Sequence, residues 1–358
     1  MKRGLVLLDP EEVSRDEWRG RTERVRRRAA DEGVDLALVY GDVFASDDIA
    51  YLTNLCIYWN EGVLALPATD AVLGSGAPVF LTKLSPRVHP WMRRVSTVER
   101  IESGKSFGAL VAALLDGRPA AAVGLVDAPL WPASVVAEIR AALPGVRVRE
   151  LPGLVREERA VVSDAELALL RRGGEVVARA AREATADGLG ALARTAVVER
   201  VVRGAGFLDV QVATPAAPDG VTGVEVTGQF RTGWLRAARL AGRAPWTRAL
   251  TEALDGAVAA ATAGATAADV AAAAAPALAG LPAGADPRVR LVDQADLASG
   301  GEYRGPAAGG PLAAGSVVAV SVDVLFESGG YAALADTVFV TGGRAERLTG
   351  GAHEEAAE

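Results

Sequence analysis

Few residues of this 358-residue chain could carry nucleophilic or acid–base chemistry through sulfur or imidazole. There are two histidines, His89 and His353, and one cysteine, Cys56. A cysteine nucleophile needs a base within hydrogen-bond reach, and His89 is the one candidate base for Cys56. Both residues also have a purely structural interpretation, because a lone histidine or cysteine is more often packed or at the surface.

Two carboxylates are better placed for proton transfer. Glu225 lies between Val224 and Val226, and apolar surroundings raise the pKa of a carboxyl group toward that of a general base. Glu225 also fits the exposed half of an alternating strand. Asp323 is a second candidate acid, because strand alternation places it on the same face as Ser321.

Arginines gather close to Glu225 in the sequence, at positions 231, 236 and 239. Guanidinium groups pair bidentately with carboxylates, so Arg236 and Arg239 predict a clamp for an anionic substrate. The alternative is a solvated strand edge. Trp234, which lies among them, fits either an apolar pocket wall or ordinary core packing.

A second polar cluster, Glu302, Tyr303 and Arg304, lies in a glycine-rich segment. Loops of this kind often carry function, and a tyrosine can donate a hydrogen bond or a proton to a substrate. An ordinary surface loop remains the alternative for these three residues.

Composition excludes several classes of partner. The net charge is −7, whereas a nucleic-acid surface must be basic, so we expect no nucleic-acid partner. Without an apolar run of about 18 residues, no membrane span is expected. A single cysteine allows no intrachain disulfide and fits a reducing cytoplasm. Gly74-Ser75-Gly76 matches no nucleotide-binding fingerprint, and we expect no cofactor.

Hydrophobic periodicity predicts two domains with different patterns. Strands alternating with helices predict a layered α/β domain with a mostly parallel sheet in the first part of the chain. The second part begins with a capping box, Ser163 to Glu166, that opens a long helix. The expected helices cover residues 14–32, 107–115, 133–143, 163–185, 195–203, 247–262 and 267–278. The expected strands cover residues 35–40, 49–52, 62–66, 78–81, 120–126, 146–151, 223–234, 317–324 and 333–340.

Several motifs resemble the creatinase, prolidase and methionine-aminopeptidase family, whose catalytic domain has the pita-bread fold. Tyr51-Leu52-Thr53-Asn54 resembles a strand end of its first domain. The segment from Ser163 to Arg172 is similar to its domain-joining segment, and Gly315 to Val318 resembles the entry to a core strand. The most specific match is Asp336-Thr337-Val338-Phe339-Val340-Thr341 with the residues through Thr349.

The resemblance implies a dinuclear metal site made of two aspartates, one histidine and two glutamates. At the matching positions this chain has Val226, Ala237, Ser321 and Ala335, and the histidine falls near Asp296. Valine and alanine side chains cannot bind a hard divalent ion. Neither histidine matches the catalytic histidine of the metal-free creatinase branch, which would fall near residues 214–219.

We therefore expect a creatinase-like N-terminal α/β domain (residues 1–153), a degenerate pita-bread α+β domain (154–350) and a flexible tail (351–358). The leading hypothesis is a metal-independent hydrolase, lyase or cyclising enzyme acting on a small anionic or amide-bearing molecule. The alternative is a non-catalytic protein that binds a ligand, peptide or partner protein. The resemblance also implies a homodimer. The candidate catalytic residues are Glu225, Tyr303, Asp323 and His89, and the candidate substrate-binding residues are Arg236, Arg239, Trp234, Glu302, Arg304 and Ser321.

Overall fold

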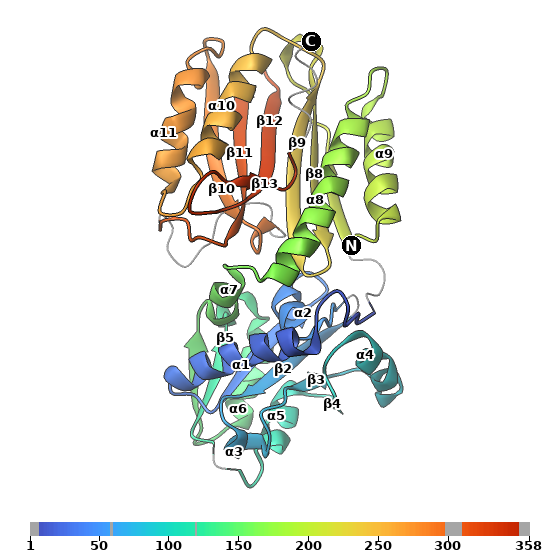
Figure 1. The fold of residues 1–358 in the computed structure, drawn as a ribbon. Coiled ribbons are helices and arrows are strands. Elements are labelled where there is room, and N and C mark those ends of the chain that lie inside the picture. Colours follow the sequence, from blue (N-terminus) through green and yellow to red (C-terminus); the bar gives the residue numbers. More distant parts are fainter. Residues whose placement is uncertain (1–6, 58–59, 119, 298–309, 351–358) are drawn as a thin grey trace. The chain divides into compact units, whose positions relative to one another are not determined.

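The computed structural model describes residues 7–57, 60–118, 120–297 and 310–350. The chain divides into two compact units, residues 1–159 and 160–358, and each unit is built on its own sheet (Figure 1). Tyr303 and its neighbours Glu302 and Arg304 lie outside the described residues, as does the predicted tail. Within the described ranges, no helix is long and apolar enough to cross a membrane.

The first unit contains a six-stranded mixed sheet in the order β4-β3-β2-β1-β5-β6. Three pairings are parallel, as expected, but β2 is antiparallel to both of its neighbours, so the sheet is less uniformly parallel than predicted. The strands are β1 (Leu36–Asp42), β2 (Glu61–Pro67), β3 (Val79–Thr82), β4 (Arg100–Ser103), β5 (Ala122–Val126) and β6 (Arg147–Leu151).

Helices cover both faces of this sheet, because β1 is apolar on both sides. Ala37 and Val39 pack in one core cluster with Val25 of α1, whereas Leu36 and Leu38 pack in another with Val111 of α5. Such continuous burial is typical of sheets covered on both faces. The helices are α1 (Arg15–Asp31), α2 (Asp47–Thr53), α3 (Asp70–Leu73), α4 (His89–Val95), α5 (Phe107–Leu115), α6 (Ala133–Ala142) and α7 (Leu154–Arg159).

The strand predicted at residues 49–52 is wrong, because this segment belongs to helix α2. Asp47 and Asp48 lie in its first turn, where negative charge favours a helix, and Asn54 ends it in the left-handed conformation with φ 65°. The run from Ile49 to Leu52 is fully buried, and periodicity cannot distinguish a buried helical turn from a buried strand. The match from Tyr51 to Asn54 is therefore a helix end.

The second unit contains a seven-stranded antiparallel sheet in the order β10-β11-β12-β9-β8-β7, with β13 paired to β12. The segment 223–234, predicted as a strand or hairpin, covers β8 and only the start of β9, so most of β9 was not predicted. The edge strands β7 and β10, which are only partly buried, were not predicted. The strands are β7 (Asp209–Ala213), β8 (Thr222–Phe230), β9 (Gly233–Ala241), β10 (Ala285–Asp293), β11 (Val317–Phe326), β12 (Tyr331–Phe339) and β13 (Glu346–Arg347).

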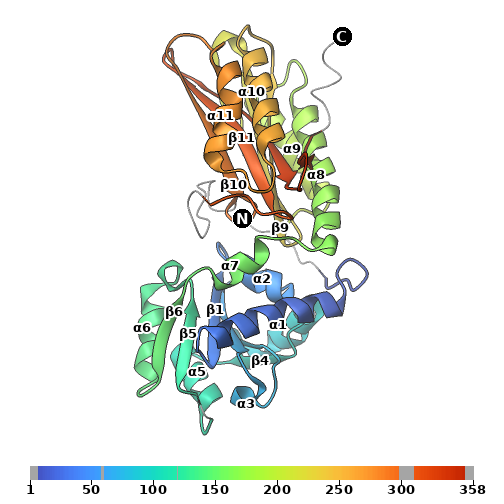
Figure 2. The ribbon, with the colours of Figure 1, turned by 60° about the vertical axis from the view of Figure 1, so that its left-hand side comes forward.

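Four helices lie along one face of this second sheet (Figures 1 and 2). Val320 and Val322 of β11 share a core cluster with Leu250 and Leu254 of α10, which identifies the helix-covered face of β11. The predicted capping box at Ser163 is present and begins α8. The helices are α8 (Asp164–Ala184), α9 (Ala191–Gly204), α10 (Thr247–Ala260) and α11 (Ala267–Leu278).

A buried ion pair joins β9 to β12. Arg239 Nη2 lies 2.6 Å from Asp336 Oδ1, and the same guanidinium donates to the carbonyl oxygens of Ala335 and Thr349. Arg347 donates to the other oxygen of Asp336 at 3.1 Å. This network fixes the strand pairing beneath the site described below. The guanidinium of Arg239, which was predicted to bind an anionic substrate, is therefore engaged in holding the sheet together.

We predict that Asp336→Asn destabilises the protein. The substitution leaves the buried Arg239 without its counter-charge, and breaking a buried pair costs about 3 kcal/mol or more. Urea denaturation would measure the change in the free energy of unfolding. Glu346→Gln, which breaks the exposed pair with Arg171, is the control and should cost less than about 1 kcal/mol. Equal effects of the two substitutions would contradict the role given to Asp336.

Candidate functional site

One row of register partners crosses six strands of the second sheet. It runs from Arg290 through Ser321, Ala335 and Ala238 to Glu225, and Ala213 follows on the edge strand. Register partners in antiparallel strands project from the same face. The row therefore lies on one face, and its members alternate along their strands with residues of the helix-covered face.

A cavity of about 390 Å³ lies on this face, and Arg290, Glu225 and Ala213 of the row line it. Ala238, Ala333 and Ala335 form a small apolar cluster on the same face, against which the cavity-lining Tyr331 packs. The cavity is lined by Gln211, Val212, Ala213, Glu225, Thr227, Arg236, Arg290, Leu297 and Tyr331.

Glu225 and Arg236 form an ion pair on the cavity wall. Arg236 Nη2 donates to Glu225 Oε2 at 2.8 Å, and both side chains are largely buried. Burial raises the pKa of Glu225 above its ordinary value, and the negative charge of Asp323 adds to this effect, although Arg236 opposes it. The carboxyl group predicted from the sequence to have a raised pKa is thus placed in a cavity beside a cation.

A second carboxylate–guanidinium pair forms at the other end of the row. Arg290 of β10 bonds Asp323 Oδ2, and Asp323 lies on the same face as Ser321, as predicted. Burial, together with the charges of Asp323 and Glu225, raises the pKa of Tyr331 to about 12. Tyr331 therefore keeps its proton at neutral pH and can act as a hydrogen-bond donor.

Ser321 Oγ, Asp323 Oδ1 and Arg236 Nε are buried on this face and have no hydrogen-bond partner within the described part of the chain. Leaving a buried polar atom unpaired costs about 1–3 kcal/mol, so such atoms are rare unless they serve a ligand or an ordered water. These atoms make the face a candidate binding site.

The other described residues that were predicted for the site do not line the cavity. Trp234 is fully buried in a cluster with Val292, Ala319 and Leu297, so it supports the cavity wall through Leu297. Arg239 and its partner Asp336 belong to the buried network described above. Asp296 is also buried, next to Leu297 in the sequence. Arg290 and Tyr331 were not predicted as site residues. Arg288 and Arg290 do alternate with Val289 and Leu291, as in a half-exposed strand.

Val226 and Ala237 do not face the cavity. They are register partners of one another, both are fully buried, and each adjoins a cavity-side residue, Glu225 or Arg236, in its own strand. Strand alternation therefore places them on the helix-covered face. Of the four positions matched to metal ligands, Ser321 and Ala335 lie in the cavity-side row, whereas the match at Val226 and Ala237 falls on the opposite face.

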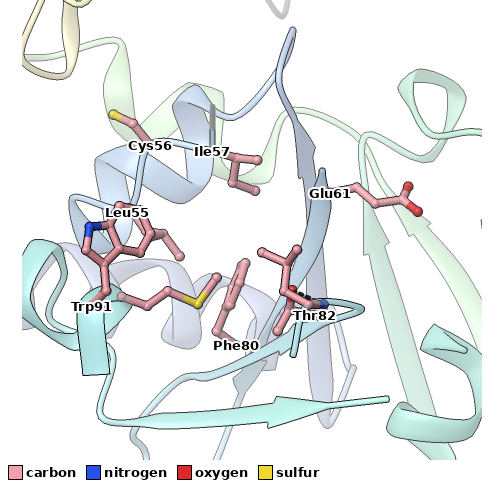
Figure 3. A pocket seen from close by; sticks show the side chains of 9 residues that line it. Leu55, Cys56, Ile57, Glu61, Phe80, Thr82 and Trp91 are labelled. Atoms are coloured by element: carbon pink, nitrogen blue, oxygen red, sulfur yellow. Dashed lines mark hydrogen bonds between the residues drawn. The ribbon is translucent and has the colours of Figure 1, made fainter. Parts of the chain in front are cut away.

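His89 and Cys56 belong to the first unit. His89 Nε2 lies 2.6 Å from Ser103 Oγ, and burial, together with the charge of Arg93, lowers the pKa of His89. Cys56 lines a separate, mostly apolar pocket in which His89 takes no part. In Figure 3 the sulfur of Cys56 and the carboxylate of Glu61 point away from the apolar side chains. This pocket encloses about 20 Å³, which is room for a single water.

Comparison with known structures identifies the architecture. An Xaa-Pro dipeptidase from Bacillus anthracis aligns with a TM-score of 0.74 at 16% identity, over 93% of this chain and 98% of that one. An X-Pro aminopeptidase from Thermotoga maritima aligns with a TM-score of 0.74 at 16% identity, over 92% and 97%. The chain has the pita-bread fold. A dipeptidase from Mycobacterium ulcerans, 20% identical, aligns with a TM-score of 0.68 over 94% of this chain and 96% of that one.

No family model and no curated protein sequence matches the chain. At these identities the likeness to the pita-bread structures shows the fold alone. It confirms the predicted architecture of a creatinase-like α/β domain followed by a pita-bread domain.

The donors around the cavity do not fit a two-ion centre. Across the described ranges, no group of three or more His, Cys, Asp or Glu side chains could hold a metal ion. The two carboxylates closest to the row, Glu225 and Asp323, are each bonded to a guanidinium. A divalent ion would have to displace Arg236 or Arg290 and tolerate the positive charge left beside it.

We predict a specific pH dependence for Glu225. Its pKa in the folded protein is raised above 4.5, so its stability contribution is complete below that value and is lost as pH rises through the folded-state pKa. The Glu225→Gln variant has no carboxyl group at this position, so its stability does not show this decrease with pH. The difference in unfolding free energy, wild type minus variant, should therefore fall as pH rises above 4.5 and through the folded-state pKa. Urea denaturation at a series of pH values would measure it, and parallel pH profiles would contradict the raised pKa.

Proposed function

We propose that the cavity is the active site of a metal-independent enzyme acting on a small anionic or amide-bearing molecule, as a hydrolase or lyase. The observation that carries this proposal is the ion pair of Glu225 and Arg236 on the cavity wall. Here burial raises the pKa of a carboxyl group that faces a cavity. Perturbed carboxyl groups in cavities are typical of acid–base catalysts.

The proposed role of each side chain depends on whether that side chain is charged or neutral. For amide hydrolysis, ionised Glu225 accepts a proton from the attacking water and returns it to the leaving nitrogen. Arg236 and Arg290 are fixed cations on the cavity wall and stabilise the negative charge that develops on the carbonyl oxygen. Tyr331, with a pKa of about 12, stays protonated and donates a hydrogen bond to the same charge.

Metal independence is part of the proposal. Its support is the bonding of Glu225 and Asp323 to guanidinium groups, together with the alanine at the matched position Ala335. Arginine is always charged in proteins and supplies the positive charge that a metal ion would otherwise provide. A cytoplasmic homodimer remains an expectation from composition and resemblance.

A non-catalytic binding protein is the second candidate. The unpartnered atoms Ser321 Oγ and Asp323 Oδ1 favour it equally, because they serve recognition whether or not a reaction follows. This alternative predicts binding of a ligand, peptide or partner protein in the same cavity without turnover.

Substitution of the proposed acid–base residue tests the enzyme directly. With a panel of small amides and lactams as substrates, Glu225→Gln should lower kcat by about 10²–10⁴-fold while the protein stays folded. Tyr331→Phe should lower kcat less, because it removes one hydrogen bond. Glu252→Gln, an exposed residue of α10, is the control and should leave kcat unchanged. Full activity of Glu225→Gln would overturn the site assignment. Binding without turnover by the wild type would favour the second candidate.

A further inference from the structure

The three unpartnered atoms on the cavity-side face of the sheet differ in hydrogen-bonding character. Asp323 is 4% exposed and its Oδ1 can only accept a hydrogen bond when the group is ionised, whereas Arg236 Nε can only donate one. Ser321 is 1% exposed, and its hydroxyl can do either. A ligand that satisfies all three must present both an N–H or O–H donor and a carbonyl-type acceptor.

The charges around the cavity limit the chemical class of ligand that fits it. Arg236 and Arg290 contribute two positive charges, and Glu225 and Asp323 contribute two negative charges when both are ionised, so the set sums to zero. Each charge is already paired, and an added net charge would find no free counter-charge among these four groups. A neutral group with a donor and an acceptor side by side, namely an amide with an N–H, fits this arrangement.

We infer that the cavity selects amides that carry an N–H group, with Asp323 and Ser321 as the residues that recognise it. This rests on the proposed function, because it assumes that the cavity binds a small molecule. Arg290 bonds Asp323, lines the cavity and is the register partner of Ser321, so both residues adjoin the part of the cavity wall that Arg290 forms. A peptide bond that precedes proline has no N–H and leaves Asp323 Oδ1 unpaired. The site therefore discriminates against prolyl amides.

A matched pair of probes tests the selection. 2-Pyrrolidinone and N-methyl-2-pyrrolidinone are neutral lactams that differ in replacement of the N–H by N–CH₃. Ligand-observed NMR titration should show that 2-pyrrolidinone binds about tenfold or more tightly, the effect of one hydrogen bond to a charged acceptor. Equal affinities, as expected if ordered water serves these atoms, would overturn the inference but leave the proposed function intact. If neither lactam binds, both the proposed function and the inference fail.

The Ser321→Ala variant distinguishes a role of Ser321 in ligand binding from a role in the stability of the fold. Because Ser321 Oγ has no partner in the described protein, its removal should leave the urea midpoint unchanged or higher, while the affinity for 2-pyrrolidinone falls about threefold or more. Ser316→Ala is the matched control. Ser316 is also buried, but its hydroxyl donates to Ala313 O at 2.8 Å. This control should lower the urea midpoint and leave lactam affinity unchanged. A lower midpoint for Ser321→Ala with unchanged affinity would assign Ser321 a structural role and overturn the inference.

Discussion

The site in the second unit depends on two ion pairs on one face of the antiparallel sheet. Each pair joins a carboxylate to an arginine. Glu225 with Arg236, and Asp323 with Arg290, place four formal charges on the sheet face that also carries the small cluster of Ala238, Ala333 and Ala335. Charges can remain partly buried at such a site because each one has an opposite charge within hydrogen-bond distance. If one member of either pair were absent, the charge of its partner would lack a counter-charge and would have to be solvated.

The two faces of this sheet have different physical tasks. The helix-covered face buries Val320, Val322 and Leu334 against α10 and provides the apolar burial that stabilises the unit. The opposite face retains unpartnered polar atoms that lower stability. The buried Arg239–Asp336 pair joins β9 and β12, so the strands beneath the cavity keep their positions without filling it. Stability and recognition are therefore supplied by different sides of the same strands.

Much of the architecture could be predicted from the sequence. The capping box at Ser163 and the alternation of Ser321 with Asp323 report local physics, and both are found in the structure. The motif around Asp336 and Thr337 led to the correct fold although no sequence comparison matches the chain. These features depend on short-range backbone rules, which survive extensive divergence.

What the sequence could not supply depends on register and on distant partners. The family resemblance matched Val226 and Ala237 to ligand positions, but the hairpin register turns both residues toward the helices. A shift of one residue reverses every side chain in a strand, so spacing alone could not decide the face. Arg290 and Tyr331 reach the cavity from strands far from Glu225 in sequence, and no local pattern connects them. Residues 49–52 of α2 were predicted as a strand because this short run is buried throughout, and periodicity does not distinguish a buried helical turn from a buried strand.

The central claim is that arginine-paired carboxylates have replaced a metal centre in this pita-bread cavity. Calorimetric titration of the purified protein with Mn²⁺ tests it most directly. The account predicts no stoichiometric binding, because Arg236 and Arg290 occupy the carboxylates that an ion would need. Tight binding of two ions per chain, lost in Glu225→Gln, would contradict it.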